Sequence, residues 1–225
     1  DFLYGDPEPE QTYVTESNGG TLNEPLSPSD RAIILYPGGF KPPHAGHYDL
    51  VSRYASDANV DKVLVLFNSK IRKSEDGEII VDKENSLYFW KKYKETLGPK
   101  VEIADMPPGS NNSPMLAAYK YVEHYAQPGE VYALAASDKD PGRADMFAKG
   151  HCHEAGKYCK AGVKVVAMIP EGSSTEALVY KDRTDDKNGK PVSASQMRED
   201  VAANDLENFT TNLPQAAKQQ AEVML

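Results

Sequence analysis

The chain has 225 residues, a length that suits one α/β domain with short additions, and its formal net charge is −9. This acidic balance argues against a surface that coats nucleic acid, so a phosphate site would have to be a local basic pocket. No apolar run approaches the roughly 20 residues that cross a bilayer, and two cysteines cannot build a disulfide framework. We therefore expect a cytoplasmic protein without membrane contact.

Residues 1–30 hold six acidic side chains before Asp30, several Pro and Gly, and no sustained apolar period. We interpret them as an acidic arm or linker. Residues 31–214 are predicted to form the folded domain, and residues 215–225 a helical tail. No basic region is followed by an apolar one at the start, so we expect no signal peptide. The first residue is not methionine, which suggests a processed product or part of a larger chain.

Continuous apolar runs alternate with amphipathic segments, the pattern of a parallel sheet covered on both faces. The predicted strands are residues 32–36, 62–67, 100–104, 130–136 and 163–169. The predicted helices are residues 47–55, 82–94 with Asp82 as N-cap, 113–126, 144–159, 195–203, and 214 to the end. Asn188-Gly189 predicts a hairpin turn between residues 178–180 and 190–192. The order implies a doubly wound α/β fold with five parallel strands.

The turn between the first strand and the first helix reads Gly-Gly-Phe-Lys-Pro-Pro-His-Ala-Gly-His. Glycines allow close backbone approach, and the helix N-terminus attracts anions. His44 and His47, one helical turn apart, could both donate N–H bonds to phosphate, and Lys41 would add a fixed charge. The alternative is a Gly/Pro turn whose histidines merely cap the helix.

This stretch resembles the first signature of the HxGH nucleotidyltransferase superfamily, which includes cytidylyltransferases and nicotinamide mononucleotide and phosphopantetheine adenylyltransferases. The resemblance covers residues 31–214, and residues 205–209 with Leu213-Pro214 are similar to the C-terminal helix pattern of phage and bacterial members. It implies strand order 3-2-1-4-5, with His44, His47, Lys41 and Arg198 as catalytic donors. It also implies nucleotide contacts from a second set of residues: Gly38, Gly39, Phe40, Gly46, Asp138, Ser193 and Ser195.

A second segment, Val-Ser-Ala-Ser-Gln-Met-Arg over residues 192–198, resembles the family's second signature, in which hydroxyls and N–H groups at a helix N-terminus hold a triphosphate. Ser195 stands where Thr is commoner, and Ala194 replaces a small polar residue or glycine. The alternative is an ordinary serine N-cap followed by a surface arginine.

A third segment, Ser-Asp-Lys-Asp over residues 137–140, resembles the family segment that approaches the nucleoside. Ala136 precedes it where Gly is usual, which leaves the closeness of approach open. The alternative is a polar loop in which Asp138 or Asp140 caps the following helix.

The resemblance implies transfer of AMP or CMP from ATP or CTP to a small phosphorylated acceptor, with release of pyrophosphate and with Mg²⁺ bridging the phosphates. The acceptor could be contacted by Asn68, Lys70 or Arg72, and the alternative is that these are solvent-exposed side chains. Tyr88 or Trp90 could stack on a base, and the alternative is that they are core aromatics.

His151, Cys152, His153 and Cys159 match no standard zinc spacing, so no protein-bound metal is predicted. The alternative function is a nucleotidyltransferase-like domain with a structural or assembly role in a larger, viral protein, located in a host cytoplasm or virion.

Overall fold

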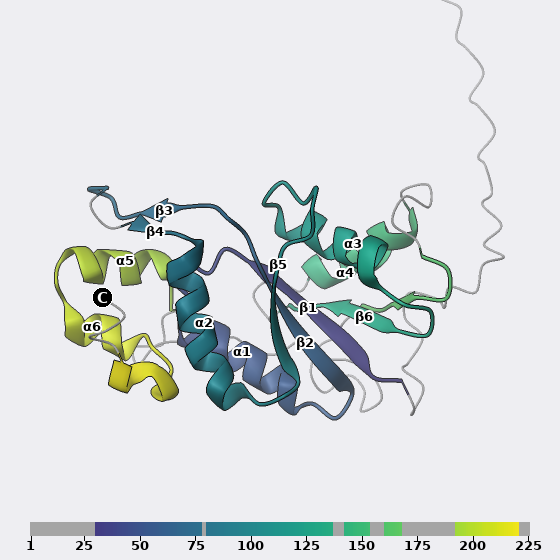
Figure 1. Ribbon diagram of the computed structural model, residues 1–225, viewed down its shortest axis with the longest axis horizontal. Helices are drawn as coiled ribbons and strands as arrows, with labels where there is room; N and C mark the ends of the chain where they lie inside the picture. The colour runs from purple at the N-terminus through teal and green to yellow at the C-terminus, as the bar shows by residue number, and fades with distance from the viewer. Residues whose placement is uncertain (1–29, 78–79, 137–141, 154–159, 168–191, 221–225) are drawn as a thin grey trace, which may run out of the picture.

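The computed structural model describes residues 30–77, 80–136, 142–153, 160–167 and 192–220. Five parallel strands form one sheet in the order β5-β2-β1-β6-β7 (Figure 1). Their bounds are β1 Ala32–Gly38, β2 Val60–Phe67, β5 Val101–Asp105, β6 Val131–Leu134 and β7 Lys164–Val165. Counted along this sheet the order is 3-2-1-4-5, so the predicted fold class and strand order are confirmed.

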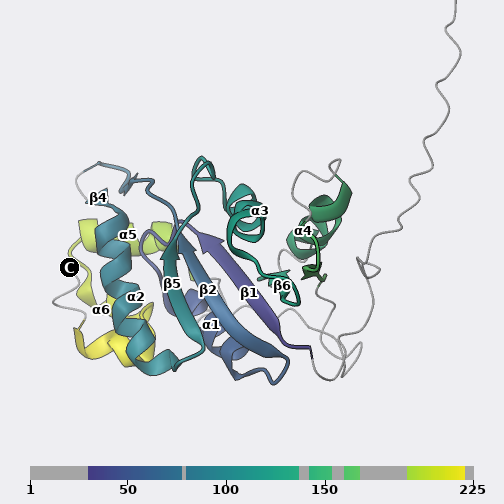
Figure 2. The ribbon, with the colours of Figure 1, turned by 45° about the vertical axis from the view of Figure 1, so that its right-hand side comes forward.

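The apolar runs form parallel strands because both faces of the sheet are covered by helices. Ile34 and Val65 pack in one apolar cluster, whereas Leu35 and Leu66 pack in another, as alternation along a strand requires. Helices α1 (Ala45–Ser56) and α2 (Lys83–Leu97) lie on the first face, and α3 (Pro114–Tyr125) and α4 (Gly142–His153) on the second (Figure 2).

Local capping explains where the central helices begin. The Asp82 carboxylate accepts from the Asn85 N–H at 2.9 Å and starts α2, which confirms the predicted N-cap. Ser113 caps α3 in the same way, and Pro114 occupies the first helical position, where its missing N–H costs nothing. No helix within the described ranges is both long enough and apolar enough to cross a bilayer.

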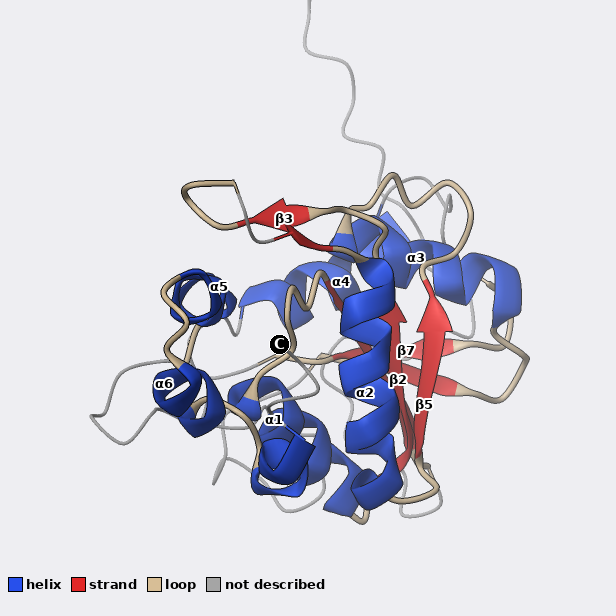
Figure 3. Cartoon of the chain, turned by 60° about the vertical axis from the view of Figure 1, so that its left-hand side comes forward, coloured by secondary structure: helices blue, strands red, loops and turns tan. Residues whose placement is uncertain are grey.

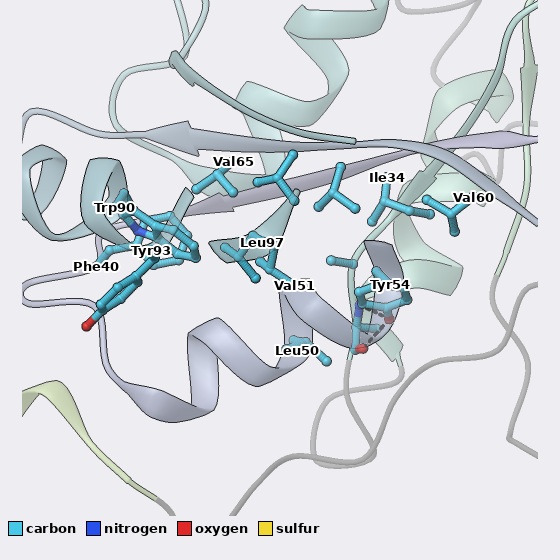
Figure 4. Close-up of a cluster of buried hydrophobic side chains, with 14 of the residues drawn as sticks. Ile34, Phe40, Leu50, Val51, Tyr54, Val60, Val65, Trp90, Tyr93 and Leu97 are labelled. Atoms are coloured by element: carbon cyan, nitrogen blue, oxygen red, sulfur yellow. Dashed lines mark hydrogen bonds between the residues drawn. The ribbon is translucent and has the colours of Figure 1, made fainter. Parts of the chain in front are cut away.

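Large aromatic side chains fill the space between α2 and the sheet (Figure 4). Trp90 and Tyr93 are fully buried, and Trp90 packs edge-on against Phe40, with ring centroids 5.3 Å apart. Of the two alternatives for Trp90, the structure therefore supports the core aromatic over base stacking. Tyr88 is 37% exposed on the same helix.

The C-terminal segment returns to the same face of the sheet as α1 and α2. It contains α5 (Ala194–Ala202), α6 (Leu206–Thr211) and a 3-10 helix (η1, Gln215–Gln220), and Ala217 is buried in the core. The predicted helix from residue 214 is a 3-10 helix over the described residues, and α6, in the segment that resembles the family's C-terminal helix pattern, was not predicted from periodicity.

The structure also contains an antiparallel hairpin in a segment where no strand was predicted. Its strands are β3 (Arg72–Lys73) and β4 (Ile80–Val81), directly before α2. The acidic arm, the 178–192 hairpin turn and the ends of the fourth helix and fifth strand fall mainly or wholly outside the described residues.

Candidate active site

The glycine-rich turn has a backbone conformation that its side chains enforce. A Cβ on Gly38 would lie 2.5 Å from the ring of Phe40, so no larger residue fits there without movement. Phe40 itself has φ +50°, a left-handed conformation that costs a non-glycine residue about 1–2 kcal/mol. Contacts of its ring with Phe67 and Trp90, at centroid distances of 5.5 and 5.3 Å, hold it in place.

The two motif histidines stack at the start of α1. Their ring centroids are 3.7 Å apart, with 25° between the planes, and the edge of Phe40 packs on His47 at 5.0 Å. The His44 backbone N–H donates to Nδ1 of His47 at 3.2 Å. Because Nδ1 accepts, the proton of a neutral His47 is on Nε2, where it can be donated to a ligand.

Lys41 is buried at the base of the turn rather than extended into solvent. Only 3% of it is exposed, and Nζ donates to Oγ of Ser86 at 3.2 Å and to the carbonyl of Asn68 at 3.5 Å. Burial lowers its pKa to about 8, an effect that Asp82 partly opposes. Lys41 was expected to carry a fixed positive charge, whereas a pKa of about 8 means that this charge titrates near neutral pH.

The second motif forms the N-terminus of α5, as predicted. Oγ of Ser193 accepts from the Gln196 N–H at 3.1 Å, so this side chain is the N-cap. Arg198 lies one turn in, and its Nη2 donates to Oγ of Ser195 at 3.0 Å. Burial lowers the pKa of Arg198, as does nearby Arg72, while Glu199 raises it.

Both motifs line one open cleft of about 310 Å³. Arg198 donates to the carbonyl of Lys41 at 2.6 Å, a direct link between segments 157 residues apart. The lining residues are Gly39, Phe40, Lys41, His44, His47, Arg72, Ser193, Ala194, Ser195 and Arg198. Every titratable side chain in this set is basic, so the cleft suits a polyanion although the chain is acidic.

Most of the predicted site residues meet in this cleft. Gly38 and Gly46 are not among the lining residues. Gly38 leaves room for the ring of Phe40, and Gly46 is buried in the first turn of α1. Asp138 lies outside the described residues. Arg72 lines the cleft although no local pattern decided between its two alternatives, because its placement depends on the short β3–β4 hairpin.

Contacts from distant segments hold the motif turn in position. The buried hydroxyl of Tyr93 on α2 donates to the carbonyl of Pro43 at 3.0 Å. The backbone N–H of Ala45 donates to the carbonyl of Asn212, after α6, at 2.9 Å. Near the C-terminal end of α1, the hydroxyl of Tyr54 donates to the carbonyl of Ala136, just after β6, and accepts from the backbone N–H of the same residue. The site is thus braced by three different elements.

The described residues contain no cluster of three His, Cys, Asp or Glu side chains that could hold a metal ion. The side chains of His151, Cys152, His153 and Cys159 lie outside the described part of the chain, so the prediction of no zinc site there remains a prediction.

Comparisons with known proteins give distant relatives and a shared fold. No family model matches the chain. The probable nicotinate-nucleotide adenylyltransferases of two Campylobacter jejuni strains, serotype O:23/36 strain 81-176 and serotype O:6 strain 81116, are 28% and 27% identical to it over 109 residues. This stretch is 47% of the chain and 58% of each relative, so the chain spans little more than half the length of the curated relatives it matches.

A solved structure shares the fold. The nicotinic acid mononucleotide adenylyltransferase of Plasmodium falciparum, complexed with APC, superposes with a TM-score of 0.53 at 12% identity. The match covers 86% of this chain and 94% of that one.

Proposed function

We propose, from the premise that the chain is a distant member of the nucleotidyltransferase superfamily, that it transfers a nucleoside monophosphate from a nucleoside triphosphate to a phosphorylated acceptor. The observation that carries the proposal is the convergence of the two histidines and Arg198 on one cleft, in which every titratable side chain of the described lining residues is basic. The names of the relatives favour ATP over CTP and a pyridine mononucleotide as the acceptor.

The reaction needs alignment and charge neutralisation rather than a general base. An oxygen of the acceptor phosphate attacks the α-phosphorus, the bond from that phosphorus to the bridging oxygen breaks, and pyrophosphate leaves. The acceptor oxygen is already anionic, so no proton has to be removed from it. The protein must hold two polyanions together and stabilise the charge that moves onto the leaving group.

The donors in the cleft suit these tasks. The Nε2–H of His47 can donate to oxygens of the α- and β-phosphates as negative charge builds up on them. Arg198 and Lys41 bring positive charge to the same cleft. No carboxylate is found among the described residues that line the cleft, so Mg²⁺ would enter with the triphosphate as its complex and be held by phosphate oxygens.

Pyrophosphate release tests the proposal. Purified protein would be incubated with ATP or CTP, Mg²⁺ and a panel of acceptors that includes nicotinate and nicotinamide mononucleotides, and triphosphate binding would be measured by calorimetry. Release with one acceptor supports the proposal. Tight binding without release for any acceptor would favour a structural role, and the absence of binding by either triphosphate would reject the assignment.

A further inference from the structure

The β3–β4 hairpin presents two neighbouring cations to opposite sides. Figures 1 and 3 show it lying over α5 beside the N-terminal end of α2. Arg72 pairs with Val81 and Lys73 with Ile80, and paired residues of an antiparallel ladder share a face. Val81 is buried whereas Ile80 is 51% exposed. Arg72 therefore faces inward, where it lines the cleft, and the Lys73 side chain faces solvent.

The hairpin is tied to α5 by two hydrogen bonds to its backbone. Nε of Arg198 donates to the carbonyl of Lys73 at 2.9 Å, and the N–H of Glu75 donates to Oε1 of Glu199 at 3.1 Å. Since Arg198 also bonds the carbonyl of Lys41, one guanidinium joins the hairpin, the motif turn and α5.

These bonds occupy most of the hydrogen-bonding capacity of Arg198. A guanidinium has five N–H groups, and four of them are used: by the carbonyls of Lys73, Lys41 and Ala194, and by Oγ of Ser195. One N–H therefore remains for a ligand. Because Arg198 has this one N–H left, a further arginine in the cleft would add a charged donor to those that Lys41 and His47 supply.

Arg72 is placed to be that donor. Its side chain is exposed, and within the described part of the chain it makes no hydrogen bond or ion pair. It is close enough to Arg198 to disfavour the charge on that residue, and none of the described residues that line the cleft with them is a carboxylate. Glu199, which is not among the described residues that line the cleft, attracts Arg198 at the same time, so an anion that binds between Arg72 and Arg198 is attracted by both cations and relieves their mutual repulsion.

We propose that Arg72 binds the triphosphate. Arg198 offers its one remaining N–H to the same ligand, and it is also the positioning residue that holds Arg72 over the cleft. The inference rests on the proposed function, since it concerns the same substrate. It makes the β3–β4 hairpin a third wall of the site, in addition to the motif turn and the N-terminus of α5.

Calorimetric titrations with ATP–Mg²⁺ and with inorganic tripolyphosphate test the role of Arg72. Arg72→Ala and Lys73→Ala remove one positive charge each from adjacent positions of the same hairpin, and Lys73→Ala leaves the carbonyl that Arg198 bonds. Arg72→Ala should weaken binding of both ligands by about tenfold to a hundredfold, the range for a charged hydrogen bond. Lys73→Ala should weaken it by less than about threefold, because salt screens an exposed, outward charge.

The positioning role is tested by a double-mutant cycle with Arg198→Lys, which keeps the charge but loses the planar fork. If Arg198 places Arg72, then Arg72→Ala should cost at least about fivefold less in the Arg198→Lys background than in the wild type. Thermal unfolding of each variant would confirm that the fold is retained.

Each failure has a separate meaning. Equal weakening by Arg72→Ala and Lys73→Ala would overturn the binding role of Arg72, and an unchanged cost of Arg72→Ala in the Arg198→Lys background would overturn the positioning role. If the wild-type protein binds neither ATP–Mg²⁺ nor tripolyphosphate, both this inference and the proposed function fail.

Discussion

Replacing Lys41 by Met should make the protein more stable and less active. The Lys41 amine is buried against Ser86 and the carbonyl of Asn68, and burial lowers its pKa from 10.5 to about 8. At a pH below 8, that gap between the folded and unfolded pKa values corresponds to a destabilisation of about 3 kcal/mol. Methionine retains an unbranched stem without the charge. We therefore expect the free energy of unfolding at pH 7 to rise by about 1–3 kcal/mol, and nucleotide turnover to fall.

The lowered pKa of Lys41 also predicts whether the free energy of unfolding rises or falls with pH. Between pH 8 and 10 the unfolded chain still holds the Lys41 proton while the native protein releases it, so wild-type stability should rise with pH. This rise should be missing in Lys41→Met. Above pH 10 the trend reverses, because burial raises the pKa values of Tyr93 and Tyr132 and the unfolded tyrosines ionise first.

Urea unfolding of both proteins at intervals from pH 7 to 9.5 measures this difference. Lys62→Met is the matched control: the hydrogen bond to Glu102 raises the Lys62 pKa, so its removal should leave the slope between pH 8 and 10 unchanged. The reasoning is refuted if wild type and Lys41→Met have equal slopes in this window, or if Lys41→Met is the less stable protein at pH 7.

Three further substitutions test the site. His47→Ala should lower the rate of pyrophosphate release by roughly 10²–10³ while weakening triphosphate binding far less, as single-turnover kinetics and calorimetry would measure. Gly38→Ala should lower stability by about 1–3 kcal/mol in urea unfolding because its Cβ meets the Phe40 ring, whereas Gly39→Ala, with 3.5 Å to its nearest neighbour, should be tolerated. Tyr54→Phe should lower stability by about 1–3 kcal/mol, since it leaves two backbone groups at the end of β6 without their partner; an unchanged urea midpoint would contradict this.

The fold could be predicted because its signals are local. Continuous apolar runs marked all five strands of the sheet, and Asp82 marked a helix start through its own side chain. The β3–β4 hairpin could not be predicted, because each strand has two residues and such a segment has no periodicity. The six-residue α6 and the 3-10 geometry of η1 were missed for the same reason.

The site could be predicted where short motifs fix backbone geometry, and less well where tertiary contacts decide. The spacing of His44 and His47 put both imidazoles on one helical turn, and the structure stacks them there. The burial of Lys41 depends on Ser86, 45 residues away, and no local pattern reports that contact. The same holds for Arg72, whose direction is set by pairing across the hairpin.

The carbonyl of Asn212, which accepts the first N–H of α1, has a consequence for how the protein matures during translation. All five strands of the sheet precede residue 166, whereas Arg198 and Asn212 are synthesised later. A ribosome-bound chain could pair its strands before it could bind a nucleotide. If the proposed function holds, nucleotide affinity would distinguish chains that include Arg198 and Asn212 from shortened ones that end after β7.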